Sequence, residues 1–374
     1  MASCVRFLQC AGFLFDSPVW DGPAEWTSIR NQDLWQTFQT VLSLCRTERI
    51  DVLFITGDLF EQDYVRRETV ERVAQSLGQL EGIRIFITPG KRDPLVMTSA
   101  YRLTAWPGNV HIFSSGVKSV GIPDLNATVS GAAWTAYHQA TPFLDDFRAP
   151  DDGALQLLLL HAEADTEKNI AFSGLDYLAL GHGDTWSGIQ KSGETYWADC
   201  GAVEARSFHH GGSHGVIIGE VNKDSSQFEF RELGQRSYIE IDLAVQPEDT
   251  MEGILEKLLA ETSPEGRQKD LFRVNLTGTL LNLQENAQFL QKRLKTEFRF
   301  LEVLTLDEKT HSLLRSPGVT AKKDLGYPTQ AQIFMDKLQE RLVNADDSES
   351  KKYWEFVQKI GLTALEQGRV FDED

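Results

Sequence analysis

The sequence is poor in cysteine and has no long apolar run. Its four cysteines form no CxxC pair, which argues against a thiolate zinc site and fits a reducing compartment. No stretch approaches the roughly 18 apolar residues of a membrane-spanning helix. The first ten residues lack a basic region followed by an apolar core, so we interpret them as a first strand and not as a signal peptide. These absences predict a cytoplasmic protein with no membrane contact.

Positive charge is also scarce. The chain carries 37 Lys and Arg against 55 Asp and Glu, a formal net charge of −18. Proteins that bind DNA by neutralising its phosphates usually present a basic surface. The charge balance therefore argues against DNA binding by this chain alone, and any DNA contact would need a local patch or a partner.

What is present is typical of a layered α/β protein. The composition is ordinary for a globular chain, with 41% hydrophobic and 25% charged residues. The first two-thirds alternates β-branched runs with helical periodicity. The predicted strands are 5–8, 51–56, 83–87, 155–160, 176–180, 196–199 and 215–221, and the predicted helices are 31–47 and 67–80. Polar groups follow directly after several of these strands, at the edge where open α/β sheets bind ligands.

The last third has a different pattern. Strands at 237–243, 271–276 and 301–305 alternate with helices at 251–261 and 284–298, a compact βαβαβ module. Two charged helical stretches follow, at 330–344 and 350–367. We therefore predict three parts: 1–235, 236–308 and a helical tail, 309–374. The apolar side chains of the tail favour a docking face over a merely solvated helix.

Five segments carry the chemistry that two-metal phosphoesterases require, which is an array of oxygen and imidazole ligands. They are Gln9–Pro18, Gly57–Phe60 (GDLF), Gly90–Asp93 (GKRD), His161 and Gly181–Asp184 (GHGD). Their order and spacing resemble the SbcD/YhaO branch of the calcineurin-like metallophosphoesterases, marked by D-x-H, G-D-x-F, G-N-H-D, a strand-terminal H and G-H-x-H. The resemblance implies a four-layer αββα fold, a small α+β capping domain, and a helical tail that binds an SbcC-like ATPase.

At five positions the chain departs from the family pattern. Gly12 and Leu14 stand where the family has its ligand Asp and His, and neither side chain offers a lone pair. Lys91 replaces a ligand Asn, and Arg92 replaces the His that protonates the leaving group. An arginine stays charged and cannot act as a general acid. Asp184 replaces the second His of the last motif. These vestigial positions predict that the first metal site is lost.

Three ligands of the family remain: Asp58, the bridging carboxylate, with His161 and His182. Two histidines and one carboxylate are a known set for a mononuclear metal. We expect no catalytic residue and no cofactor, and the surviving set would suit at most a single Mn²⁺ or other divalent ion.

The substitutions also suggest an electrostatic replacement. Without metal, Asp58 would lie in the cleft without a counter-charge, which costs several kcal/mol for a buried carboxylate. Lys91 and Arg92 enter the same turn. We therefore predict that both form an ion-pair cluster with Asp58.

Two further features have competing interpretations. The cluster His209–His214 (HHGGSH) is either a metal site or a solvated Gly-rich turn, and we favour the turn. Trp20, Trp26 and Trp35 are either a base-stacking surface or packing, and the scarcity of nearby basic charge favours packing.

The sequence thus supports three hypotheses. The first is a catalytically degenerate SbcD/YhaO-like subunit that acts as a scaffold or regulator in DNA repair, beside an SbcC/YhaN-like coiled-coil ATPase that supplies DNA contact. The second is a weakened one-metal phosphodiesterase or exonuclease using Asp58, His161 and His182. The third is an unrelated binding module on the same fold. The family's habit of pairing leaves a homodimer open.

Overall fold

The computed structural model describes residues 4–18, 20–138, 144, 147–163, 167–246, 249–278, 283–305 and 354. The chain divides into two compact units. The first comprises residues 1–17 and 24–238, and the second comprises residues 18–23 and 239–374. The predicted tail, 309–374, lies outside the described residues except for Trp354. No helix in the described ranges is long and apolar enough to cross a membrane.

The first unit is built on two six-stranded mixed sheets. The first sheet has the order β12 (Ser226–Glu232), β11 (Gly215–Asn222), β1 (Cys4–Cys10), β2 (Val52–Ile55), β3 (Arg84–Ile87), β4 (Val110–Ile112). The second has the order β5 (Lys118–Ile122), β6 (Ala127–Ala132), β7 (Leu155–Leu160), β8 (Tyr177–Leu180), β10 (Thr195–Asp199), β9 (Gln190–Ser192). β1, β2, β3 and β4 are parallel to one another, as are β6, β7, β8 and β10.

Alternating side chains of both sheets meet in one apolar core. Phe7, Phe54, Leu157, Tyr177 and Ile217 belong to it, and each is fully buried. Because successive side chains of a strand point to opposite faces, the other faces of the sheets are free to pack on helices. The predicted sandwich of two sheets is confirmed.

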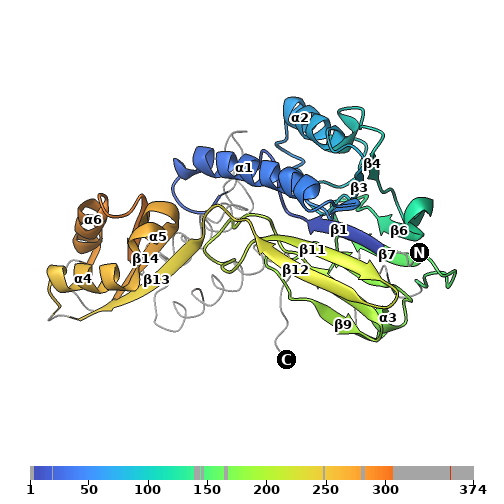
Figure 1. Cartoon of the computed structure of the whole chain (residues 1–374). Helices are drawn as coiled ribbons and strands as arrows, with labels where there is room; N and C mark the ends of the chain where they lie inside the picture. The colour runs from blue at the N-terminus through green and yellow to red at the C-terminus, as the bar shows by residue number, and fades with distance from the viewer. Residues whose placement is uncertain are drawn as a thin grey trace. The chain divides into compact units, whose positions relative to one another are not determined.

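Helices cover the outer face of each sheet. α1 (Trp26–Thr47) and α2 (Arg67–Gly78) lie over the first sheet (Figure 1) and bury one apolar stripe each, which includes Phe38 and Leu42 on α1 and Val70 and Leu77 on α2. The short α3 (Glu167–Ala171) packs through Ile170 on the second sheet. Two 3₁₀ turns, Ala100–Arg102 and Pro123–Leu125, complete the unit. The layers are therefore α, β, β, α, as in the calcineurin-like metallophosphoesterases.

The second unit is a three-stranded sheet of order β13 (Tyr238–Val245), β14 (Leu271–Gly278), β15 (Phe300–Thr305). Three helices accompany it: α4 (Met251–Glu261), α5 (Pro264–Lys269) and α6 (Leu283–Leu294). Ile254 of α4 and Leu290 of α6 pack with Val274 of β14 in its core. The predicted alternation of strands and helices is present.

The tryptophans are packing residues. Trp26 is buried against Phe208, with ring centroids 6.5 Å apart. Trp35 packs on Phe15, and the guanidinium of Arg72 lies 3.8 Å from its ring centroid. Trp20 is buried in the second unit. No open stacking surface is formed by these three rings, in agreement with the interpretation favoured from sequence.

Candidate functional site

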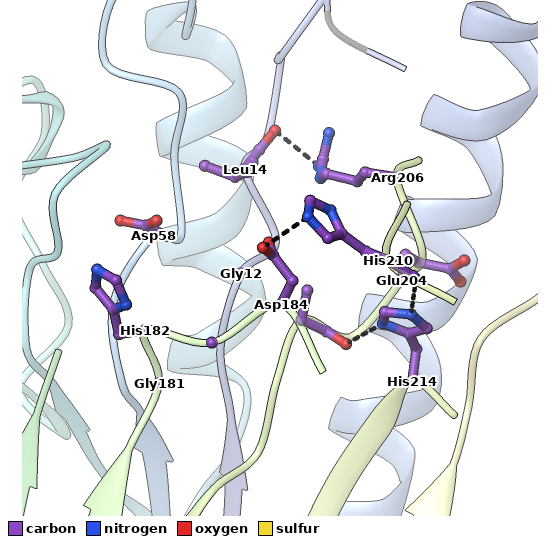
Figure 2. A pocket seen from close by; sticks show the side chains of 12 residues that line it. Gly12, Leu14, Asp58, Gly181, His182, Asp184, Glu204, Arg206, His210 and His214 are labelled. Atoms are coloured by element: carbon purple, nitrogen blue, oxygen red, sulfur yellow. Dashed lines mark hydrogen bonds and ion pairs between the residues drawn. The ribbon is translucent and has the colours of Figure 1, made fainter. Parts of the chain in front are cut away.

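The motif residues converge on one cleft of the first unit. The loops after β1, β2, β7 and β8 meet at the carboxyl ends of the parallel strands, and Nε2 of His161 lies 3.4 Å from Oδ1 of Asp58. Figure 2 shows the pocket they form. Its lining residues are Gly12, Leu14, Asp58, Gly181, His182, Gly183, Asp184, Ala202, Glu204, Arg206, His210 and His214.

Gly12 and Leu14, the two substituted positions after β1, both have a left-handed backbone conformation. Gly12 has φ of +65°, and a Cβ added there would lie 2.8 Å from Cβ of Ala202. The neighbouring backbone is held by a hydrogen bond from the amide of Val203 to the carbonyl of Ala11. Leu14 has φ of +47°, where a bulky residue is rare. A side chain at position 12 would therefore need the 202–203 backbone to move.

Asp184 has gained a protein partner. Its Oδ2 lies 3.2 Å from Nε2 of His210, and Figure 2 shows this imidazole extending across the pocket to reach it. Both side chains are about half exposed, so the pair contributes about 1 kcal/mol or less to stability. Beside it, the buried guanidinium of Arg206 donates to the carbonyls of Phe13 and Leu14. The residues that the resemblance assigns to the first metal thus contact other protein groups.

Asp58 is a strained and largely buried carboxylate. Its φ is +53°, and its Oδ1 accepts the amide N–H of Arg92 at 2.8 Å. Burial raises the pKa of Asp58 to about 6, against the lowering influence of Arg92. Nδ1 of His161 lies 3.1 Å from the carbonyl of Thr56, which favours a proton on Nδ1 and leaves Nε2 facing Asp58. Burial lowers the pKa of His161, so this imidazole is neutral at pH 7.

The cations of the third motif do not pair with Asp58 as predicted. Lys91 is exposed and forms no ion pair with any residue that the structure describes. The guanidinium of Arg92 binds the buried carboxylate of Glu61, and only the backbone amide of Arg92 reaches Asp58. The prediction of a Lys91/Arg92–Asp58 cluster is therefore wrong. Glu61 is only 4% exposed, and a buried carboxylate without a cation is costly, so the guanidinium of Arg92 is paired there.

Asp93, the last residue of that motif, has a structural role that the sequence did not reveal. Its carboxylate accepts the amides of Asp58, Leu59, Phe60 and Gly90 and the hydroxyl of Tyr101. Burial raises the pKa of Asp93 to about 6, whereas these donors favour its charged form. We take Asp93 as the carboxylate that keeps its charge longer, and Asp58 as the one that is protonated first. Asp93 fixes the turn that positions Asp58.

His182 is presented at the cleft by a tightly held backbone. The amides of His182 and Gly183 both donate to Oδ2 of Asp199. The ring of His182 lies 5.2 Å from that of His161 between centroids. Burial lowers the pKa of His182, and so does His161.

The donor set does not fit a binuclear centre. The side chains of Gly12 and Leu14 supply no ligand atom, and Lys91 is an exposed cation. Across the ranges that the structure describes, no group of three or more His, Cys, Asp and Glu side chains is arranged to hold a metal ion. A residual ion at Asp58, His161 and His182 remains a prediction.

The histidine cluster was only partly anticipated. His209, Gly211 and Gly212 are exposed, as expected for a solvated turn. However, His210 and His214 line the pocket, and His214 is only 4% exposed. Its ring nitrogens lie 3.0 Å and 3.1 Å from the carbonyls of Ala202 and His210. Sequence reasoning also missed Glu204 and Arg206, two charged residues in the loop that follows β10.

Comparisons with known proteins found a curated relative and several solved structures. The chain is 22% identical to the uncharacterized metallophosphoesterase YhaO of Bacillus subtilis, and the match covers 83% of each chain. No protein-family profile matches the sequence. Among solved structures, TT1561 of Thermus thermophilus is 10% identical with a TM-score of 0.39, covering 60% of this chain and 98% of its own. A dimetal phosphatase from Danio rerio is 9% identical with a TM-score of 0.40, covering 62% and 97%.

Proposed function

Because this chain has the calcineurin-like metallophosphoesterase fold and resembles YhaO along most of its length, we propose that it is a degenerate member without phosphoesterase turnover. It acts as a scaffold or regulator in DNA repair, and it works beside an SbcC/YhaN-like coiled-coil ATPase. DNA reaches the complex through that partner, since a net charge of −18 disfavours contact with phosphates by this chain alone.

One observation carries the proposal: the residues that the resemblance assigns to the first metal lack ligand atoms or are paired with other protein groups. Ala202 packs against Gly12 where a ligand side chain would project. Arg206 binds the carbonyls of the 13–14 backbone, and His210 is paired with Asp184. A phosphoester held between two metal ions needs both ions to balance the charge on its attacking and leaving oxygens. This cleft supports no such pair of ions.

The purified protein should contain less than one equivalent of transition metal and should not hydrolyse phosphodiesters when Mn²⁺ is added. We would measure bound metal by elemental analysis, and turnover on bis-p-nitrophenyl phosphate and on single-stranded and double-stranded DNA. Asp58→Ala should behave as the wild type in both assays. So should Gly12→Asp, because the restored side chain has no room beside Ala202.

Turnover that Asp58→Ala abolishes, and that Asp63→Ala (an exposed carboxylate in the next turn) retains, would contradict the proposal. That result would favour the alternative function, a weakened one-metal phosphodiesterase or exonuclease. The observation in favour of this alternative is the approach of His161 to Asp58, 3.4 Å, with His182 beside it. In that case a single Mn²⁺ or similar ion would be held by these three residues and would polarise the phosphoryl oxygen.

The partner is tested separately. The full-length chain should co-elute with a purified SbcC/YhaN-like ATPase on size exclusion, and DNA should bind the mixture but not the chain alone. If the chain alone bound DNA as tightly as the mixture, the partner-dependent role would be wrong. The same column would report a homodimer.

A further inference from the structure

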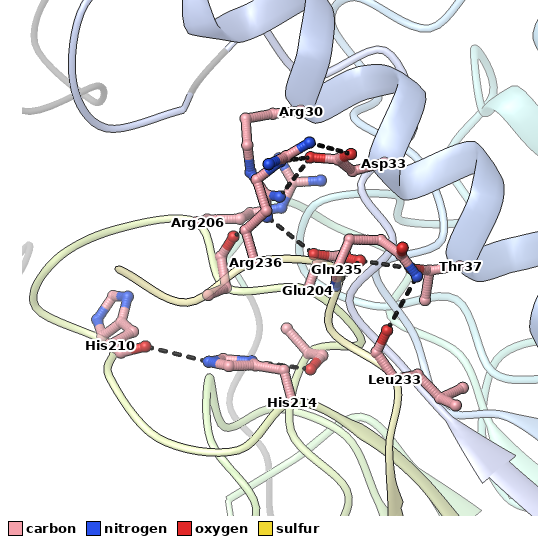
Figure 3. A network of polar contacts seen from close by, with 12 residues as sticks. Arg30, Asp33, Thr37, Glu204, Arg206, His210, His214, Leu233, Gln235 and Arg236 are labelled. Atoms are coloured by element: carbon pink, nitrogen blue, oxygen red, sulfur yellow. Dashed lines mark hydrogen bonds and ion pairs between the residues drawn. The ribbon is translucent and has the colours of Figure 1, made fainter. Parts of the chain in front are cut away.

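A buried carboxylate anchors one edge of the pocket. Glu204 is fully buried, although it lies on the pocket lining, because its side chain turns toward α1. Oε2 accepts Nη2 of Arg30 at 2.8 Å. Oε1 accepts the hydroxyl of Thr37 and, at 2.9 Å, the backbone amide of Gln235 (Figure 3). One side chain therefore joins α1, the pocket edge and the chain that follows β12.

Two cations and two carboxylates meet around Glu204. Arg30 also donates to Asp33 at 2.8 Å, and Asp33 accepts Nε of Arg236 at 2.8 Å. Burial opposes the charge of Arg30, but Glu204, Tyr238 and Asp33 together raise the pKa of Arg30. Two cations thus balance two carboxylates in a place with little solvent, where removing one member leaves an uncompensated charge. A displacement of one of these four side chains is therefore expected to displace the others.

The network joins the edge of the pocket to the segment of chain that leaves the first unit. Two residues after Glu204, Arg206 binds the carbonyls of the 13–14 backbone at the cleft. On the other side, Gln235 and Arg236 lie immediately before Tyr238, after which the chain passes into the second unit. The ring of Tyr238 packs edge-on against Phe208, with centroids 4.8 Å apart. The pocket edge and the exit from the first unit thus share the same buried support.

We propose that Glu204 couples the cleft to the connecting segment 233–238, so that a displacement of this segment is transmitted to residues 204–214 and to the 13–14 backbone that Arg206 holds. The coupling is a mechanical device within the first unit. It would let whatever engages the rest of the chain change the shape of the cleft. It requires no turnover and no metal.

Hydrogen–deuterium exchange of the full-length protein tests this device. Arg236→Gln removes the ion pair with Asp33 at the connecting segment, and it does not touch the pocket. We expect exchange to accelerate on the order of tenfold both at 233–238 and at 204–214, because local opening becomes easier when a charged hydrogen bond is lost. Arg231→Gln breaks other ion pairs, with Glu48 and Glu229, and its effect should stay within β11, β12 and the end of α1 where Glu48 lies. If Arg236→Gln does not fold, Arg236→Lys provides the milder perturbation.

A second variant separates transmission through Glu204 from a general destabilisation of the first unit. In a Glu204→Gln background the link is already weakened, so adding Arg236→Gln should no longer change exchange at 204–208. Residues near His214 are left out of this comparison, because the carbonyl of His214 accepts the amides of Leu233 and Gly234 directly. Two results would overturn the proposal. In one, Arg236→Gln accelerates exchange only at 233–238. In the other, Arg236→Gln accelerates exchange at the pocket edge by the same factor whether residue 204 is glutamate or glutamine. Either result leaves the proposal of a non-catalytic protein unaffected, because exchange does not report turnover.

Discussion

Replacing Asp58 with asparagine should stabilise the protein at pH 8 and leave its stability at pH 4 unchanged. Burial raises the pKa of this carboxyl from its ordinary value of 3.8 to about 6. The folded state therefore holds the proton over a range in which the unfolded chain has released it. For an acid with a raised pKa, the contribution to stability is fully present below pH 4 and is lost as pH rises through 6.

Asparagine has no carboxyl to ionise, so the variant does not lose stability as pH rises, and the local contacts of residue 58 can be kept. Its amide oxygen can still accept the N–H of Arg92, which lies 2.8 Å from Oδ1 of Asp58. Its backbone preference also suits φ of +53°, since asparagine is among the residues that tolerate this region best. The rise of the pKa from 3.8 to about 6 corresponds to a gain on the order of 3 kcal/mol at pH 8. Because Asp58 and Asp93 titrate as a pair, part of this gain is shared with Asp93.

Urea unfolding of wild type and variant between pH 4 and pH 8 would measure the effect. Asp63→Asn is the matched control, since Asp63 is exposed in the next turn and its replacement should change little. The sign of the stability change at pH 8 separates the candidate functions. If the resting protein held a metal at Asp58, asparagine would destabilise the protein at pH 8, and chelation would reverse the sign of the difference from wild type.

Replacing Arg30 with leucine should strongly destabilise the first unit. Arg30 is fully buried, and its loss leaves the carboxylate of Glu204, also fully buried, without its cation. Breaking a buried pair from one side typically costs about 3–5 kcal/mol. Thr37 and Gln235 still donate to Glu204, which limits the loss to that range.

The measurement is again urea unfolding at pH 7. Arg67→Leu provides the control, because Arg67 is 63% exposed and its 3.8 Å pair with Glu71 should contribute less than about 1 kcal/mol. The double variant Arg30→Leu/Glu204→Leu should recover part of the stability, since no unpaired charge then remains at this position. A cost for Arg30→Leu as small as that of the control would show that Glu204 does not depend on its cation.

The strands were largely predictable from the sequence. The apolar run at Leu155–Leu160 is β7 at the predicted bounds, and Asp58, His161 and His182 lie after strands as expected. Buried strands are locally encoded by β-branched and apolar runs, and strand ends by Gly and Pro, so this agreement has a local cause. α1 begins at Trp26, five residues before the predicted start, and the structure gives it no side-chain cap that the sequence could have signalled.

The pairing of charges could not be predicted in the same way. The turn that contains Lys91 and Arg92 lies beside Asp58. However, the guanidinium of Arg92 binds Glu61, and Lys91 is exposed. Asp184 pairs with His210, and Glu204 pairs with Arg30 at a separation of 174 residues. Which carboxylate receives a cation depends on how deeply each one is buried, and burial is a property of the packed chain.

The sequence by itself determined that two ligand positions, Gly12 and Leu14, can donate nothing to a metal, because ligand chemistry belongs to the side chain alone. It also determined that the surviving motif residues would meet, because parallel strands bring their carboxyl ends to one edge. Only the tertiary structure decided that Ala202, Arg206 and His210 would occupy the space around those positions. Contacts between distant segments are fixed by the packing of whole layers, and no local pattern in the sequence records them.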